Sequence, residues 1–149
     1  MPPTPEKKIR VLFIDDDGNI RIFASVMFSS QLFEITVAED TLQADAFLKN
    51  GSFDMIVCDV MMPNEDGIQF CNRLKKAGNS TPFIFLSAVS QPETVNKGLV
   101  AGANAYFIKP FDALELQRKI VSLVMPRGTT RPSSDPKEPK KPTHWFRRA

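Results

Sequence analysis

Five short runs of apolar residues recur along the chain, and segments with helical periodicity separate them. The runs are Ile9–Ile14, Phe33–Ala38, Met55–Cys58, residues 82–87 and Ala105–Ile108. Continuous β-prone runs of this length, bounded by turn residues, are typical of strands that are buried on both faces. The run Phe33–Ala38 alternates instead, which predicts a strand near a sheet edge.

The segments between and after these runs place apolar residues three or four positions apart, which predicts five helices. Asp40 or Thr41 can cap the second helix, which is expected to end at Lys49, and Asp112 can cap the fifth. The fourth helix, over residues 91–101, has a thin apolar face and is expected to be loosely held. The predicted inward positions are Ile20, Phe23, Ala24 and Met27 in the first helix, Ile68, Cys71 and Leu74 in the third, Val95, Leu99 and Val100 in the fourth, and Ala113, Leu116, Ile120 and Val124 in the fifth.

This alternation of strands and helices, with short connections, predicts an α/β fold with a parallel sheet that helices cover on both faces. In such folds the ligand site lies at the carboxyl ends of the strands, near the point where the strand order reverses. Side chains that directly follow the strands are therefore expected to converge on one rim.

The composition changes sharply at residue 126. The chain has 149 residues, of which 42% are hydrophobic and 24% charged, and this favours one globular domain. We expect a leader at 1–7, a domain at 8–125 and a flexible tail or linker at 126–149. The tail carries seven Lys/Arg and two Asp/Glu of a chain whose net charge is +2, so the charge of the domain is about −3. The basic tail is therefore poor evidence that the domain binds nucleic acid.

Targeting features point to a soluble, cytoplasmic protein. Cys58 and Cys71 lie in apolar patterns and are expected to be buried free thiols. The N-terminus lacks the apolar core of a signal peptide, and no apolar stretch approaches the roughly 20 residues that span a bilayer.

Four strand ends carry residues whose side chains could bind a metal or take part in a reaction. Asp15, Asp16 and Asp17 follow the first strand, Asp59 follows the third, Ser87 ends the fourth and Lys109 follows the fifth. Clustered carboxylates repel one another, and a hard divalent cation such as Mg²⁺ relieves that repulsion. With a metal and Lys109 to neutralise developing charge and Ser87 to donate a hydrogen bond, Asp59 is placed to attack phosphorus and become an aspartyl phosphate. Each residue alone also fits a helix cap, a turn or a surface charge, and it is their coincidence that indicates chemistry.

Over residues 8–125 the chain resembles a receiver domain of the two-component response-regulator family. The resemblance rests on the acidic run after the first strand and on four further motifs: CDVMMPNEDG around Asp59, FLSA at Ser87, Gly102-Ala103, and YFIKPF at residues 106–111. It implies a flavodoxin-like (βα)5 three-layer sandwich with a five-stranded parallel sheet of order 2-1-3-4-5.

The resemblance also implies a role for each site residue. Asp59 would be the phosphoacceptor. Asp16, the Asp59 carboxylate and the Met61 backbone carbonyl would bind Mg²⁺ directly, with Mn²⁺ as an alternative ion, and Asp15 would act mainly through metal-bound water. Ser87 and Tyr106 would form the switch, Lys109 would pair with the phosphoryl group, and the Lys109–Pro110 peptide bond would be cis.

The family takes its phosphoryl group from a phosphohistidine on a sensor histidine kinase or a histidine phosphotransfer protein, and the receiver itself catalyses the transfer and its own dephosphorylation. The single histidine, His144, lies in the tail and is not expected to be the donor. Output would pass to a downstream protein or domain through the fourth helix, fifth strand and fifth helix, without contact to nucleic acid or membrane. Met61 and Val89 offer no side-chain group that could orient water, which predicts that the phosphorylated form lives longer than it would with polar residues at these positions.

Two other readings fit part of the sequence. The FIDDDGNI segment resembles the first motif of haloacid-dehalogenase-type phosphatases, in which Asp15 would be the nucleophile and Asp17 the general acid. That family needs a further acidic pair beyond the lysine, and it leaves Asp59 unexplained. The chain could also be a binding module that has lost phosphorylation. The sequence leaves open whether an output domain follows, and whether Trp145 and Phe146 anchor a docking segment or belong to a linker.

Overall fold

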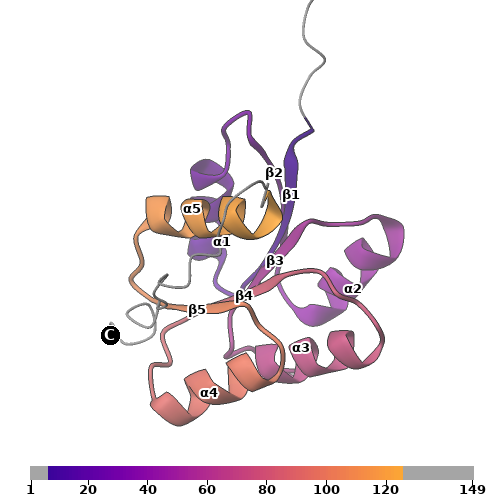
Figure 1. Ribbon diagram of the computed structural model, residues 1–149, viewed down its shortest axis with the longest axis vertical. Coiled ribbons are helices and arrows are strands. Elements are labelled where there is room, and N and C mark those ends of the chain that lie inside the picture. The colour runs from indigo at the N-terminus through magenta and orange to yellow at the C-terminus, as the bar shows by residue number, and fades with distance from the viewer. Residues whose placement is uncertain (1–6, 126–149) are drawn as a thin grey trace, which may run out of the picture.

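The computed structural model describes residues 7–125, so the predicted tail and all but the last residue of the predicted leader lie outside the described chain. Ten elements alternate along it (Figure 1). They are β1 (Ile9–Ile14), α1 (Gly18–Met27), β2 (Phe33–Ala38), α2 (Thr41–Asn50), β3 (Met55–Cys58), α3 (Gly67–Lys76), β4 (Phe83–Ser87), α4 (Pro92–Val100), β5 (Ala105–Ile108) and α5 (Ala113–Val124).

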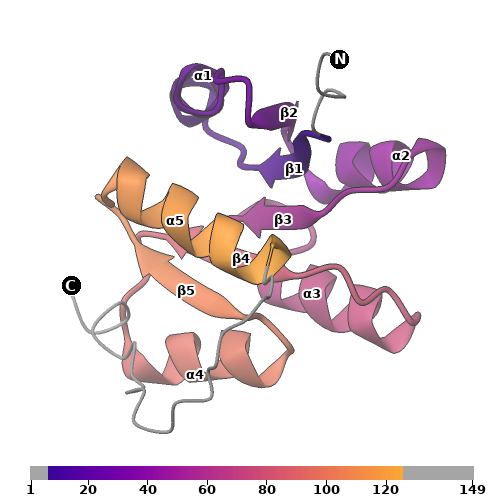
Figure 2. The same ribbon diagram turned by 45° about the horizontal axis from the view of Figure 1, so that its top comes forward.

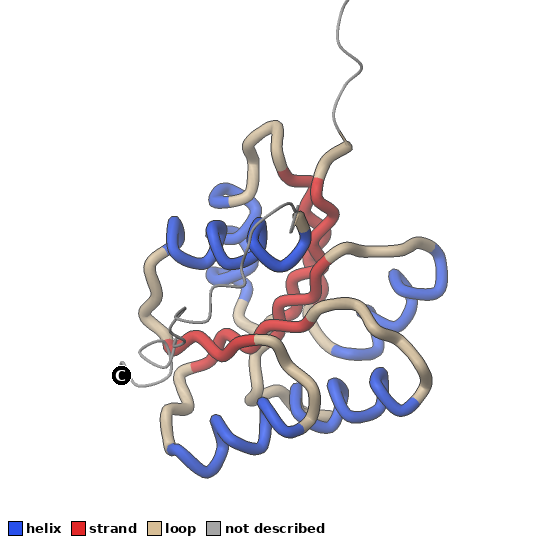
Figure 3. The backbone as a smooth tube through the Cα atoms, in the orientation of Figure 1, coloured by secondary structure: helices blue, strands red, loops and turns tan. Residues whose placement is uncertain are grey.

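The strands form one parallel sheet in the order β2-β1-β3-β4-β5, which confirms the predicted doubly wound fold. Helices α1 and α5 lie on one face of the sheet, and α2, α3 and α4 lie on the other (Figures 1 and 2). The strands form a twisted sheet that runs through the centre of the molecule between the helices (Figure 3, red). The strand order reverses between β1 and β3, and β2 is an edge strand as expected.

Each face of the sheet carries its own hydrophobic core, because successive residues of a strand point to opposite faces. In β1, Leu12 and Ile14 pack toward α2, α3 and α4, whereas Val11 and Phe13 pack toward α1 and α5. Burying one such side chain contributes about 1.5–3 kcal/mol, so the two cores hold the strand ends firmly in place.

Aspartates begin four of the five helices in residues 7–125. The side chains of Asp17, Asp40, Asp66 and Asp112 each accept a backbone N–H in the first turn. Asp40 rather than Thr41 is therefore the cap of α2, and Asp66 forms a capping box with Gln69 that the sequence analysis did not identify.

Two of the predicted inward positions, Phe23 and Val100, are exposed in the structure. Phe23 is 47% exposed and lies edge-on against Phe111, with ring centroids 6.0 Å apart, because Phe28 instead fills the core under α1. Val100 is 77% exposed, since α4 approaches the sheet through Val95 and Gly98. Within the described helices, none combines the length and hydropathy that a bilayer crossing requires.

Candidate functional site

The residues predicted at four strand ends lie together at one rim of the sheet. Asp15 and Asp59 follow Ile14 and Cys58, which are paired across β1 and β3, and the Asp59 N–H donates to the Ile14 carbonyl at 3.0 Å. On the other side, the Lys109 N–H donates to the Ser87 carbonyl at 2.9 Å. The parallel register of the sheet thus gathers side chains that are up to 94 residues apart in sequence.

Three carboxylates form the centre of this rim. Asp15, Asp16 and Asp59 each offer an oxygen atom, and these oxygens lie within 4.8 Å of one another. Asp15 is 1% and Asp59 8% exposed, whereas Asp16 is open to solvent. Burial, the largest effect, raises the pKa of Asp15, while hydrogen bonds from Asp17 and Lys109 oppose the rise. A compact set of carboxylate oxygens with one open side suits a hard divalent cation such as Mg²⁺.

Lys109 joins two of these carboxylates. Its Nζ lies 2.9 Å from Asp15 Oδ2 and 3.2 Å from Asp59 Oδ2. Burial alone would lower the pKa of Lys109, but the hydrogen bond to Asp15 and the charge of Asp59 outweigh it, so the net pKa is raised. Lys109 therefore stays an ammonium at neutral pH. The Lys109–Pro110 peptide bond is cis, the isomer that the sequence analysis expects.

The loop after Asp59 is packed tightly against the phosphoacceptor candidate. The Met61 N–H donates to Asp59 Oδ1 at 3.3 Å, and the Gly67 N–H donates to the Val60 carbonyl at 2.8 Å. A Cβ atom on Gly67 would overlap the Asp59 carbonyl oxygen. Glycine is a common turn residue, and here the absence of a side chain on Gly67 also allows the start of α3 to pack against the site. The Met61 side chain is 62% exposed and points no polar group at Asp59.

Ser87 and Tyr106 meet at one main-chain segment. The Ser87 hydroxyl accepts the Val89 N–H at 3.1 Å, and the Tyr106 hydroxyl donates to the Val89 carbonyl at 2.7 Å. Both side chains are fully buried. Burial raises the pKa of Tyr106, and hydrogen bonding with Ser87 opposes the rise. The Tyr106 ring contacts Phe85, and a Cβ on Gly98 would crowd both rings, so α4 packs directly on them.

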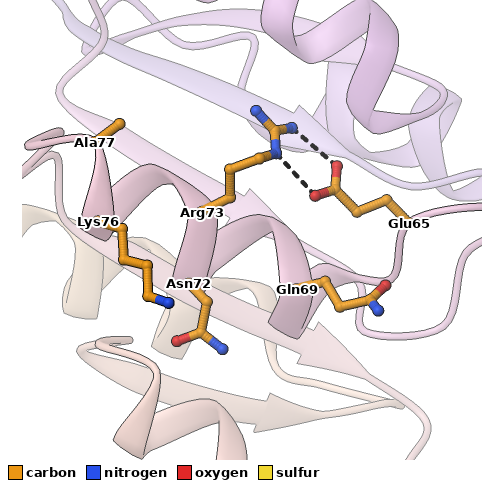
Figure 4. Close-up of a pocket in the computed structure, with 6 residues that line it drawn as sticks. All are labelled: Glu65, Gln69, Asn72, Arg73, Lys76 and Ala77. Atoms are coloured by element: carbon orange, nitrogen blue, oxygen red, sulfur yellow. Dashed lines mark hydrogen bonds and ion pairs between the residues drawn. The ribbon is translucent and has the colours of Figure 1, made fainter.

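An ion-pair network outside the rim was not found from the sequence. Arg73 on α3 binds Glu65 through Nε and Nη2, at 2.9 and 2.8 Å, and binds Asp45 on α2 at 2.9 Å. The bond to Arg73 lowers the pKa of Glu65. Glu65 precedes α3, so the helical spacing of residues in the sequence gave no indication that it pairs with Arg73. Figure 4 shows Arg73 extending to Glu65 in an open surface pocket that is also lined by Gln69, Asn72, Lys76 and Ala77.

Comparison with known proteins shows the family to which this fold belongs. The family model for the response regulator receiver domain matches residues 11–121. The response regulator MprA of Mycobacterium sp. (strain KMS) is 32% identical over 131 residues, which are 88% of this chain and 56% of that protein. The chain spans about half the length of such curated relatives, or less.

Solved structures show the same architecture. The receiver domain of the Francisella response regulator 1452 is 35% identical, with a TM-score of 0.76 over 81% of this chain and 100% of that one. The chemotaxis protein CheY4 of Vibrio cholerae is 28% identical, with a TM-score of 0.72 over 78% of this chain and 99% of that one. The similarity therefore extends over most of the described fold.

Proposed function

The chain belongs to the response-regulator receiver domain family of two-component signalling, and from this premise we propose that Asp59 accepts a phosphoryl group from a phosphohistidine of a partner protein. The observation that carries the proposal is Lys109, whose ammonium bridges Asp15 and Asp59 at the strand ends. A buried carboxylate beside a fixed cation, with further carboxylates for a metal, is the arrangement that phosphoryl transfer to a carboxylate needs.

The metal site of this proposal uses the carboxylate cluster. Asp16, Asp59 and the Met61 carbonyl would hold Mg²⁺ or Mn²⁺ directly, and Asp15 would act through water; the compact set of carboxylate oxygens supports this assignment. When bound, the ion would supply positive charge beside the phosphoryl oxygens.

The protein's own residues do the rest of the chemistry. A bond forms between an Asp59 carboxylate oxygen and phosphorus while the P–N bond of the donor breaks. Lys109 neutralises charge on the transferring group, and the Ser87 hydroxyl donates a hydrogen bond to one of its oxygens. The domain acts as a signalling phosphoacceptor that catalyses its own modification and its loss.

The same residues suggest how the state of Asp59 reaches the surface. Ser87 Oγ now accepts the Val89 N–H, and the Val89 carbonyl accepts the Tyr106 hydroxyl. If Ser87 turns to the phosphoryl group, the segment at Val89 follows, and Tyr106 with the packed α4 follows that segment. Phosphorylation would thus shift the population of conformations at the surface of α4, β5 and α5.

The partners follow from the chemistry and the family. The donor would be a sensor histidine kinase or a histidine phosphotransfer protein, and the receiver of the signal a downstream protein or an output domain at the α4-β5-α5 surface. The buried free thiols Cys58 and Cys71 support a reducing, cytoplasmic setting. No contact with nucleic acid or membrane is part of this proposal.

Labelling with acetyl phosphate, followed by intact mass spectrometry, tests the proposal. We expect the wild-type chain to gain one phosphoryl group in Mg²⁺ and to gain none in excess chelator. Asp59→Asn should abolish labelling, whereas Asp54→Asn, a change of the same kind at the other end of β3, should not. Labelling that persists in Asp59→Asn and peptide mapping to Asp15 would support the phosphatase reading. A wild-type chain that neither binds Mg²⁺ nor accepts phosphate would support the binding-module reading.

A further inference from the structure

Asp15 is held at every polar atom. Its N–H donates to the Ala38 carbonyl at 3.1 Å, and its Oδ1 accepts the Asp17 N–H at 2.9 Å. Its Oδ2 accepts the Lys109 ammonium at 2.9 Å, and its main-chain carbonyl accepts Arg21 Nη1 at 2.9 Å. Two of these contacts come from side chains, those of Lys109 and Arg21, and the proposed chemistry uses only Lys109.

Arg21 reaches back from α1 to the loop that precedes the helix. Its own N–H donates to the Asp17 carbonyl at 3.1 Å as part of the helix, while its guanidinium holds the Asp15 carbonyl. Both ends of the acidic loop are therefore bonded to one residue.

The bond to the Asp15 carbonyl also constrains Asp16. The peptide unit from the Asp15 carbonyl to the Asp16 N–H is planar and rigid, so fixing its oxygen fixes the direction in which the Asp16 backbone leaves it. Asp16 is exposed, so burial orients it less than it orients Asp15. The orientation of its carboxylate toward Asp59 thus depends on the plane that Arg21 anchors.

We propose that Arg21 is a positioning residue for divalent-cation binding: by holding the Asp15 carbonyl, it keeps the Asp15–Asp17 loop in the orientation that directs Asp15 and Asp16 toward Asp59. This inference rests on the proposed function, since it concerns the metal site of the same rim. Arg21 itself contacts neither the metal nor the phosphoryl group and acts only through the loop.

The direction of the change in Mg²⁺ affinity distinguishes a positioning role of Arg21 from an effect of its charge alone. A guanidinium near the three carboxylates repels a divalent cation, so loss of its charge alone would strengthen Mg²⁺ binding. Loss of an anchor that orients ligands weakens binding, typically by about 10–100-fold for groups that support metal ligands. The two explanations therefore predict opposite changes in one dissociation constant.

The test is isothermal titration of the whole chain with MgCl₂, without any phosphoryl donor, for wild type, Arg21→Met, Arg21→Lys and Arg118→Met. Arg118→Met is the matched control, because it removes the same charge from an exposed position on α5. Equilibrium unfolding of each variant in chelator measures any loss of stability separately, and Arg21→Lys serves as the main variant if Arg21→Met does not fold.

We expect Arg21→Met to bind Mg²⁺ about tenfold more weakly than Arg118→Met, and Arg21→Lys, which can still donate one hydrogen bond, to recover part of that loss. Equal or tighter binding by Arg21→Met, or binding by Arg21→Lys no better than by Arg21→Met, overturns the proposal. A wild-type chain that binds no Mg²⁺ contradicts the proposed metal site, and this inference with it, whereas normal wild-type binding with an unaffected Arg21→Met contradicts only the role of Arg21.

Discussion

Gly67 offers a sharp test of how the site is packed, because a matched control exists in the same chain. Gly67 and Gly18 both begin a helix directly after an aspartate cap, at α3 and α1. A Cβ on Gly67 would overlap the Asp59 carbonyl oxygen and approach the Phe85 ring at 3.1 Å. A Cβ on Gly18 would meet only Arg21 Nη2, at 3.4 Å, which is an ordinary van der Waals distance.

The structure predicts opposite effects on the free energy of unfolding. Gly18→Ala should stabilise by about 0.4–1 kcal/mol, because alanine restricts the unfolded chain at a position whose conformation it can adopt. Gly67→Ala gains the same benefit but forces a methyl group into the main chain of the site, and overpacking costs about 1–3 kcal/mol. Because a main-chain carbonyl cannot rotate out of the way, we expect a net loss of about 2 kcal/mol.

Urea unfolding monitored by circular dichroism measures both variants against wild type, and acetyl-phosphate labelling measures the site. Gly67→Ala should also be labelled more slowly, because relief of the overlap moves the Asp59 main chain and disturbs the contact between Asp59 and Lys109. If Gly67→Ala is as stable as Gly18→Ala and is labelled at the wild-type rate, the tight packing of α3 against Asp59 is not what constrains this position.

Three further predictions concern the rim. Met61→Asn should shorten the lifetime of the phosphorylated form severalfold after removal of the donor, since an amide can orient water where Met61 and Val89 cannot; equal or slower decay would contradict this. Asp16→Asn should stabilise the metal-free protein by about 1 kcal/mol, the cost of one like-charge pair near 4.8 Å in water, and should abolish the rise in thermal midpoint that Mg²⁺ gives the wild type. A thermal shift with Mg²⁺ that survives in Asp16→Asn would argue against its role as a ligand. Because the pKa of Lys109 is raised above 10.5, its stabilising charge is complete below that pH and is lost as the pH rises through the higher folded-state value. Lys109→Met should therefore flatten the alkaline fall in the free energy of unfolding, and an unchanged slope in urea titrations would refute this.

Much of the fold was predictable because the relevant signals are local. The apolar runs of β1, β3, β4 and β5 are short and continuous, and the turn residues between them mark where each strand ends. Alternation with helices then restricts the topology to a parallel sheet with right-handed connections. Parallel strands in one sheet all end on the same side. The topology therefore places four groups on one rim: the acidic run, Asp59, Ser87 and Lys109.

Positions that depend on contacts between distant elements were harder to predict. Phe23 and Phe28 lie on neighbouring parts of one helical segment, and periodicity favoured Phe23 as the core residue. In the structure Phe28 packs between Phe13 and Phe33, with ring centroids 6.4 and 4.9 Å away, on strands that the pattern of α1 does not encode. The ion pairs of Arg73 escaped detection for the same reason.

The sequence by itself therefore determined the order of the elements, the end of the sheet that carries the chemistry, and the residue types available there, because strand length, turn composition and side-chain chemistry are properties of short segments. Only the tertiary structure decided that Lys109 bridges Asp15 and Asp59, that Gly67 lets α3 press against the Asp59 carbonyl, and that Arg21 anchors the acidic loop. Each of these depends on distances between side chains and main chain on separate elements, and such distances exist only once the two cores have packed.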